Sequence, residues 1–117
     1  MNHVVPSPLT ARRAGPLKGR ARVPGDKSIS HRAVLIGALC DGETRVSGFG
    51  RSADTEATIA AVRALGIEVY EHGAETLRVF GKGLRGLVAP STAIDCGNAG
   101  TLVRLLAGIL AGQSGQE

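Results

Sequence analysis

The chain has 117 residues and a formal net charge of +4, and 17 of its residues are glycine. Hydrophobic residues make up 43%, charged residues 21% and aromatic residues 3%. This composition excludes collagen-like, coiled-coil and wholly disordered chains. No apolar stretch is long enough for a helix that crosses a bilayer, so we expect no membrane partner. By length alone the chain corresponds to one ordinary domain.

Basic residues are concentrated near the start of the chain. Five of them precede Gly25 in a stretch that lacks Asp and Glu: Arg12, Arg13, Lys18, Arg20 and Arg22. A positive balance of this kind indicates anionic partners. Phe49, Tyr70 and Phe80 are too few and too scattered for the stacking that single-stranded nucleic acids require. We therefore expect small phosphates or carboxylates and no nucleic acid.

The first half of the chain begins with a proline-rich segment. Residues 1–16 hold Pro6, Pro8 and Pro16 without a hydrophobic period, which predicts a flexible lead. A short strand is predicted over Leu17–Val23, because apolar and basic residues alternate up to Pro24-Gly25. A helix is predicted over Ser28–Leu39, with Ser28 as its N-cap and most of its surface buried.

Alternating elements continue through the second half. The predicted order is a strand at Glu43–Phe49, a helix at Ala53–Leu65 capped by Ser52, a hairpin of Ile67–Glu71 and Leu77–Phe80 with one wet face, a strand at Ala93–Cys96, and a buried helix at Ala99–Ala111. Helices and strands in this order predict an α/β or mixed α+β fold in which helices cover a sheet.

Two predicted helix starts resemble each other. Gly25-Asp26-Lys27-Ser28 leads to Arg32, and Gly97-Asn98-Ala99-Gly100 leads to Arg104, 72 residues further on. In both segments a glycine and an Asx residue precede an apolar helix that carries an arginine in its second turn. The shared context indicates an internal repeat.

The chemistry of such a helix start favours anions. The first turn of a helix exposes unpaired N–H groups and partial positive charge, and an arginine can clamp a carboxylate or a phosphate. Lys27, Ser28 and Arg32 bring three anion-binding groups into one turn and a half. Arg104 is the only charged residue on its apolar helix, so it is interpreted either as an anion-binding residue or as a side chain that covers the helix end.

At these residues the chain resembles the 5-enolpyruvylshikimate-3-phosphate synthase family. The resemblance runs from about Leu17 to the last residue, and it rests on the run Val23-Pro24-Gly25-Asp26-Lys27-Ser28-Ile29-Ser30-His31-Arg32, on Ser52-Ala53-Asp54-Thr55, and on Gly97-Asn98-Ala99-Gly100-Thr101 with Arg104. It implies a transferase that moves the enolpyruvyl group of phosphoenolpyruvate to the 5-hydroxyl of shikimate 3-phosphate with release of phosphate. It also implies two lobes built from βαβαββ units, with a hinge near residues 24–28 and residues 17–117 forming only the first part.

The resemblance further implies roles for individual residues. Lys27 would contact phosphoenolpyruvate and lie close to shikimate 3-phosphate, Ser28 would hydrogen-bond that second substrate, and Arg32 would bind its carboxylate. The family's phosphoenolpyruvate pocket, which also binds the herbicide glyphosate, would be bordered by Asn98 and Gly100, with Thr101, Arg104 and Leu105 behind it. The combination of Gly100 with Leu105 leaves the response to the herbicide open.

The family's principal acid–base carboxylates come from later segments that this chain does not hold. We therefore expect the chain alone to be inactive and to need the C-terminal remainder of the enzyme as its partner. The alternative is a free-standing binding module for a small phosphorylated ligand. The related transferase that acts on a UDP-sugar usually has Lys-Asn where this chain has Lys27-Ser28, which disfavours it.

The remaining polar groups receive plainer interpretations. His31 is predicted to be a surface or hinge histidine, and Asp54 to be a helix-start charge or a residue that orders lobe contacts. Cys40 and Cys96 fit buried, reduced thiols, which predicts a cytoplasmic protein. His3 and His72 have no second ligand nearby, so we predict neither a metal site nor a cofactor.

Overall fold

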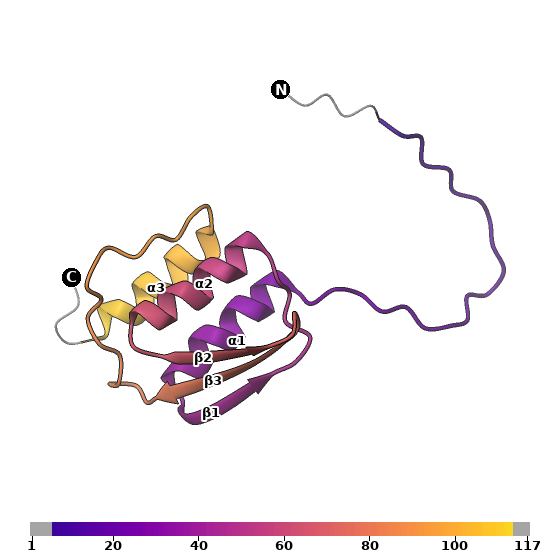
Figure 1. The fold of residues 1–117 in the computed structure, drawn as a ribbon. Helices are drawn as coiled ribbons and strands as arrows, with labels where there is room; N and C mark the ends of the chain where they lie inside the picture. Colours follow the sequence, from indigo (N-terminus) through magenta and orange to yellow (C-terminus); the bar gives the residue numbers. More distant parts are fainter. Residues whose placement is uncertain (1–5, 114–117) are drawn as a thin grey trace.

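The fold is a layer of three helices on a three-stranded sheet, seen in a computed structural model that describes residues 6–113 (Figure 1). The predicted mixed α/β class is confirmed. The elements in chain order are α1 (Lys27–Leu39), β1 (Asp41–Val46), α2 (Ala53–Ala64), β2 (Glu68–His72), β3 (Thr76–Lys82) and α3 (Gly100–Ala111). From α1 to β3 this order matches a βαβαββ unit without its first strand.

The sheet is antiparallel, with β3 between β1 and β2. Val79 pairs with Thr44 on one side and with Val69 on the other. Leu77 and Val79 have no exposed surface, because this face of β3 lies under the helices. Tyr70 on the opposite face is about half exposed. The predicted hairpin with one wet face is therefore confirmed.

An ion-pair cluster lies on the exposed face of this sheet. Glu43 on β1 accepts hydrogen bonds from Arg78 on β3 at 2.6 Å and from Arg45 at 3.0 Å. These hydrogen bonds, with that from Arg78 the stronger, lower the pKa of the Glu43 carboxyl from 4.5 to about 2. The guanidinium of Arg78 also lies 5.1 Å from the ring centre of Phe80. The cluster joins β1 to β3 by charge on the solvent side.

This cluster predicts a pH dependence of stability. A carboxyl group whose folded pKa is lowered stabilises the fold above its unfolded pKa, and this contribution disappears as the pH falls from about 4.5 through about 2. Urea unfolding of wild type and Glu43→Gln should therefore differ at pH 6 and converge toward pH 2. Glu68→Gln, on the same face of the sheet, is the control and should track wild type. An equal gap at both pH values would contradict the prediction.

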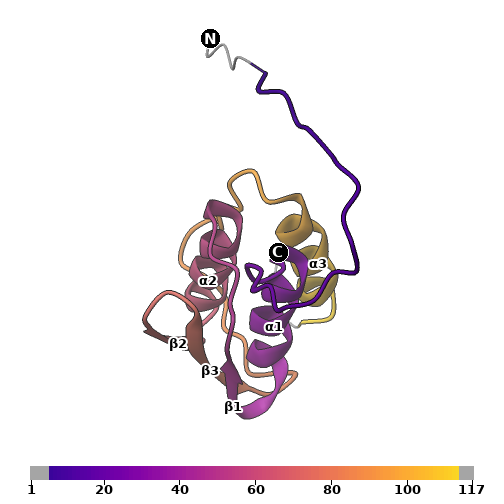
Figure 2. The same cartoon turned by 90° about the vertical axis from the view of Figure 1, so that its right-hand side faces the viewer.

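The three helices run in the same general direction. In Figure 1 each begins at the side of the molecule where the N-terminal arm enters, and Figure 2 looks onto that end. α2 begins as predicted, with the Ser52 hydroxyl accepting a hydrogen bond from the Thr55 N–H at 3.2 Å. The parallel course places the first turns of α1, α2 and α3 at one end of the helix layer. None of the helices described for residues 6–113 is long and apolar enough to cross a membrane.

Two predictions about helix burial are wrong. On α1, Ile29 is 68% exposed and Ile36 is 59% exposed. On α3, Leu102 and Leu106 are buried, whereas Val103 is half exposed. The reason is that each helix packs against its neighbours along one stripe. Ile29 and Ile36 of α1 and Val103 of α3 lie outside that stripe and face outward.

Two predicted strands do not form. Residues 17–23 are extended but have no hydrogen-bonded neighbour, with Leu17 93% exposed and Val23 78% exposed. Figure 1 shows this arm leaving the body of the fold. An alternating pattern becomes a strand only when a partner completes its hydrogen bonds, and the described part of the chain offers none to the arm. Residues 93–96 likewise form no strand; there the Asp95 carboxylate accepts a hydrogen bond from the Gly97 N–H at 2.7 Å and turns the chain.

Candidate functional site

The start of α1 is capped by the side chain of the residue just before the helix. Asp26 has an extended backbone (φ −70°, ψ 134°), and its carboxylate accepts a hydrogen bond from the Ile29 N–H at 2.8 Å. The prediction of Ser28 as the N-cap is therefore wrong by two residues. Asp26 is the N-cap because it lies three positions before Ile29, whose N–H has no partner within the helix, and this is the spacing of an N-cap hydrogen bond. Ser28 lies within the first turn and is exposed.

Lys27, the first residue of α1, is held across to the start of α2. Its ammonium donates a hydrogen bond to the Asp54 carboxylate at 2.9 Å, and its side chain is 56% exposed. Asp54 was expected to be a helix-start charge, and it does lie in the first turn of α2. Its contact with Lys27 could not be predicted from either residue's local pattern, because it depends on how the two helices pack.

Below Lys27 the two loops that enter α1 and α2 cross at glycines. The Gly50 N–H donates to the Ser30 hydroxyl at 2.8 Å, and that hydroxyl donates to the Asp26 carbonyl at 2.6 Å. A Cβ on Gly25 would overlap the Gly48 carbonyl oxygen and lie 2.7 Å from the Gly50 nitrogen. These contacts at the crossing therefore fix the backbone at the start of α1, from which the Lys27 side chain extends.

His31 is fully buried, so of the two predicted alternatives the surface histidine is wrong. Its Nδ1 shares a 2.5 Å hydrogen bond with the hydroxyl of Thr58 on α2, which is also fully buried. Burial lowers the pKa of His31; Asp54 partly offsets this, and Lys27 and Arg32 lower it further. The ring is therefore neutral at physiological pH. The polar neighbours in its sequence, Ser30 and Arg32, concealed its inward orientation.

The internal repeat is visible in the structure. The Arg32 guanidinium donates to the Ser28 carbonyl at 3.1 Å, and the Arg104 guanidinium donates to the Gly100 carbonyl at the same distance. Each arginine thus folds back over the first turn of its own helix. Both side chains remain exposed. The interpretation of Arg104 as a cover for its helix end is confirmed, and it applies equally to Arg32.

The start of α3 differs from that of α1 in one respect. Ala99 is the N-cap residue, and no side chain caps the helix. Asn98 is exposed and, unlike Asp26, leaves the first N–H groups of its helix unpaired by a side chain. Gly100 is also exposed, and a Cβ there would lie 2.7 Å from the nearest guanidinium nitrogen of Arg104. This end of α3 offers backbone donors that no side chain caps, beside the exposed guanidinium of Arg104.

The two remaining predicted residues lie further along α3. Thr101 and Leu105 are both half-buried, and Leu105 packs against the core. The predicted set therefore divides between the starts of α1 and α3, at one end of the helix layer, with Leu105 behind the second of them.

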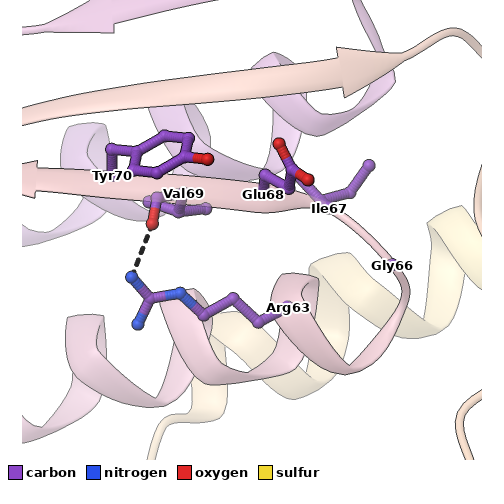
Figure 3. A pocket seen from close by; sticks show the side chains of 6 residues that line it. All are labelled: Arg63, Gly66, Ile67, Glu68, Val69 and Tyr70. Atoms are coloured by element: carbon purple, nitrogen blue, oxygen red, sulfur yellow. Dashed lines mark hydrogen bonds between the residues drawn. The ribbon is translucent and has the colours of Figure 1, made fainter.

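The hollows on the surface agree only partly with this division. A hollow of about 300 Å³ includes Lys27 and lies against the glycine crossing and Arg51. A larger hollow of about 410 Å³ lies at the edge strand β2, where Arg63 donates to the Val69 carbonyl at 2.6 Å (Figure 3). None of the predicted site residues lines it, and Arg63 there satisfies a strand edge. The predicted residues therefore lie at the helix starts and not in the larger hollow.

The cysteines differ from prediction as well. Cys40 is exposed and Cys96 is half-buried, and both are free thiols. Burial, helped by the negative charge of Asp95, raises the pKa of the Cys96 thiol, which makes it a poor nucleophile. Over residues 6–113 no group of three or more His, Cys, Asp or Glu side chains could hold a metal ion.

Comparisons with known proteins match these observations. The curated 3-phosphoshikimate 1-carboxyvinyltransferases of Ruegeria sp. and Herpetosiphon aurantiacus are 51% identical over 109 residues and 54% identical over 104 residues, covering 93% and 89% of this chain. The solved structure of EPSP synthase from Acinetobacter baumannii aligns with a TM-score of 0.77 and 42% identity over 81% of this chain and 22% of its own. The chain spans 24% of the length of both curated relatives. The family model for EPSP synthase (3-phosphoshikimate 1-carboxyvinyltransferase) matches residues 11–117, and the chain belongs to this family.

Proposed function

We propose that this chain is the N-terminal part of an enzyme that transfers the enolpyruvyl group of phosphoenolpyruvate to the 5-hydroxyl of shikimate 3-phosphate and releases phosphate. The observation that carries the proposal is the presence of two arginine-bearing helix starts at one end of the helix layer, in a member of this family. Both substrates are small polyanions. Their charge suits cationic side chains and helix N–H groups.

Each predicted residue has a role in the proposal. Lys27 contacts both substrates, Ser28 hydrogen-bonds shikimate 3-phosphate, and Arg32 binds the carboxylate of that substrate. Phosphoenolpyruvate lies against the open start of α3, bordered by Asn98 and Gly100. The second-turn and later residues Thr101, Arg104 and Leu105 support this wall. The exposure of Ser28, Arg32, Asn98 and Gly100 supports their access to a ligand.

The chemistry needs more than this chain holds. The substrate 5-hydroxyl must lose a proton as its oxygen bonds to C2 of phosphoenolpyruvate, and the methylene carbon must gain one. The tetrahedral intermediate then loses phosphate and a proton, which restores the double bond. Lys27 and Arg32 can hold and neutralise the anions during these steps. We assign the acid–base carboxylates to the remainder of the enzyme.

The domain boundaries are part of the proposal. Residues 17–117 form the first portion of the transferase, and residues 1–16 form a flexible lead, of which residues 1–5 lie outside the described part. The hinge between the lobes lies near residues 24–28, and the extended, unpaired course of residues 17–23 just before it supports a crossing to another part of the enzyme. A cytoplasmic location completes the proposal, supported by the two free thiols.

The test is an assay of phosphate release from phosphoenolpyruvate and shikimate 3-phosphate. The purified 117-residue chain should release none, and the enzyme that also carries the remainder should release phosphate in proportion to its concentration. Lys27→Ala in that enzyme should abolish most of the activity. Calorimetry of the isolated chain with shikimate 3-phosphate checks the alternative, since tight binding by the chain alone would indicate a free-standing binding module.

A further inference from the structure

Two polar contacts join α1 to α2, one helical turn apart. The outer contact is Lys27 to Asp54 at 2.9 Å, and the inner contact is His31 to Thr58 at 2.5 Å. Each joins residues 27 positions apart in the chain. Residues four positions apart share one face of a helix, so the equal spacing means that the two helices run parallel and in register here.

The inner contact is better suited than the outer one to hold this register. An exposed ion pair such as that of Lys27 contributes little, because solvent screens it and two long side chains must be ordered. His31 and Thr58, in contrast, have no exposed surface, and losing their hydrogen bond would leave buried polar atoms without a partner. A rotation or slide of α1 against α2 would separate His31 from Thr58, and the cost of leaving these buried groups unpaired opposes such a movement.

We propose that His31 is a positioning residue for Lys27, acting through its buried contact with Thr58. The proposal uses the proposed function only in that Lys27 faces a ligand. His31 touches no ligand in this arrangement. It fixes the helix face from which the Lys27 ammonium reaches Asp54, and thereby the place where that ammonium meets an incoming anion.

This role requires a neutral imidazole. The charged groups that act on the ring are Lys27 and Arg32 from α1 and Asp54 from α2. Nε2 is buried with no hydrogen-bond partner among the described residues. Protonation makes both ring nitrogens donors, so Nε2 becomes a buried donor without a partner and the ring adds a positive charge beside Lys27 and Arg32, which only Asp54 offsets among these groups. Asp54 would then be drawn from Lys27 toward the ring, so acidification should loosen the outer contact.

The experiment uses the ligand-free 117-residue chain. Nuclear magnetic resonance of the Lys27 ammonium reports its exchange with solvent, and circular dichroism reports the fold. His31→Leu fills a similar volume without a hydrogen bond, whereas an asparagine amide can reach the position of Nδ1. We expect exchange at Lys27 to be about fivefold faster in His31→Leu, the effect of about 1 kcal/mol from one hydrogen bond, and close to wild type in His31→Asn.

Acidification supplies a readout that a purely structural role would not move. The Lys27 signal of wild type should follow the titration of His31, and that of His31→Asn should not. Equal exchange in wild type and a folded His31→Leu would overturn the proposal, as would a His31→Asn that behaves like His31→Leu. If His31→Leu fails to fold, Thr58→Val against Thr58→Ser makes the same comparison.

Failure of this proposal is distinguishable from failure of the proposed function. Titration of the enzyme that carries both lobes with shikimate 3-phosphate tests the ligand, while Lys27 exchange in the isolated chain tests the positioning. If Lys27 exchange responds to the His31 variants but the enzyme does not bind shikimate 3-phosphate, the proposed substrate is wrong and the positioning role of His31 still holds.

Discussion

Gly25→Ala should lower the stability of the chain by about 3 kcal/mol, because its new methyl group would overlap backbone rather than a movable side chain. That methyl group would meet the Gly48 carbonyl oxygen and lie 2.7 Å from the Gly50 nitrogen. To make room the crossing must open, which breaks the hydrogen bond from the Gly50 N–H to the Ser30 hydroxyl. For a domain of this size the melting temperature should fall by about 15 °C.

Gly15→Ala is the matched control. Nothing lies within 4 Å of a Cβ at that position in the arm, so its melting temperature should equal that of wild type. Thermal unfolding followed by circular dichroism measures both variants. A Gly25→Ala chain that melts with wild type would show that the crossing does not hold the start of α1. The requirement for glycine at position 25 would then have to come from ligand approach alone.

The elements that could be predicted from the sequence are those with local signals. Ser52 with Thr55 marks the start of α2, and the alternation of Val69 and Leu77 with polar residues marks the wet-faced hairpin. Both signals depend on neighbours a few positions apart. The strand predicted over residues 17–23 has the same kind of alternation and still fails, because a strand also needs a partner. An alternating sequence pattern predicts a preference for extended backbone, and a hydrogen-bonded neighbour decides whether a strand forms.

The candidate residues could be named from local patterns, whereas the contacts that hold them could not. Lys27, Arg32 and Arg104 could be named because each follows a glycine–Asx start, and the structure places all three at one end of the helix layer. Asp54 and Thr58 could not be assigned their contacts, since these join residues 27 positions apart through helix packing. His31 was misplaced for the same reason. A buried histidine between Ser30 and Arg32 has no local signature.

The two helix starts are equivalent in sequence but not in what they leave open. The Asp26 carboxylate pairs with the Ile29 N–H of α1, beside the exposed residues Lys27, Ser28 and Arg32. Asn98 makes no cap on α3, whose backbone donors remain open to a ligand. We therefore propose that side chains hold most of the anionic charge at the start of α1, whereas backbone N–H groups and Arg104 hold it at the start of α3.

Gly100→Ala should weaken phosphoenolpyruvate binding by the enzyme that carries both lobes while leaving the melting temperature nearly unchanged. The new methyl group would lie 2.7 Å from the Arg104 guanidinium, which is the far end of a flexible side chain and can move away. Alanine is also a better helix former than glycine. The displaced arginine loses its place over the first turn, and loss of one charge-assisted hydrogen bond of about 1.5 kcal/mol corresponds to about tenfold weaker binding.

A double-mutant cycle separates this route from direct crowding of the ligand. If the effect passes through Arg104, Gly100→Ala should cost about tenfold in the wild-type background and little in Arg104→Ala, because the affected side chain is already absent. If instead the methyl group occupies the ligand's own space, the two substitutions should be additive. Isothermal calorimetry with phosphoenolpyruvate measures all four variants. Additivity would assign the glycine at position 100 to ligand approach, and non-additivity would assign it to the arginine that folds over it.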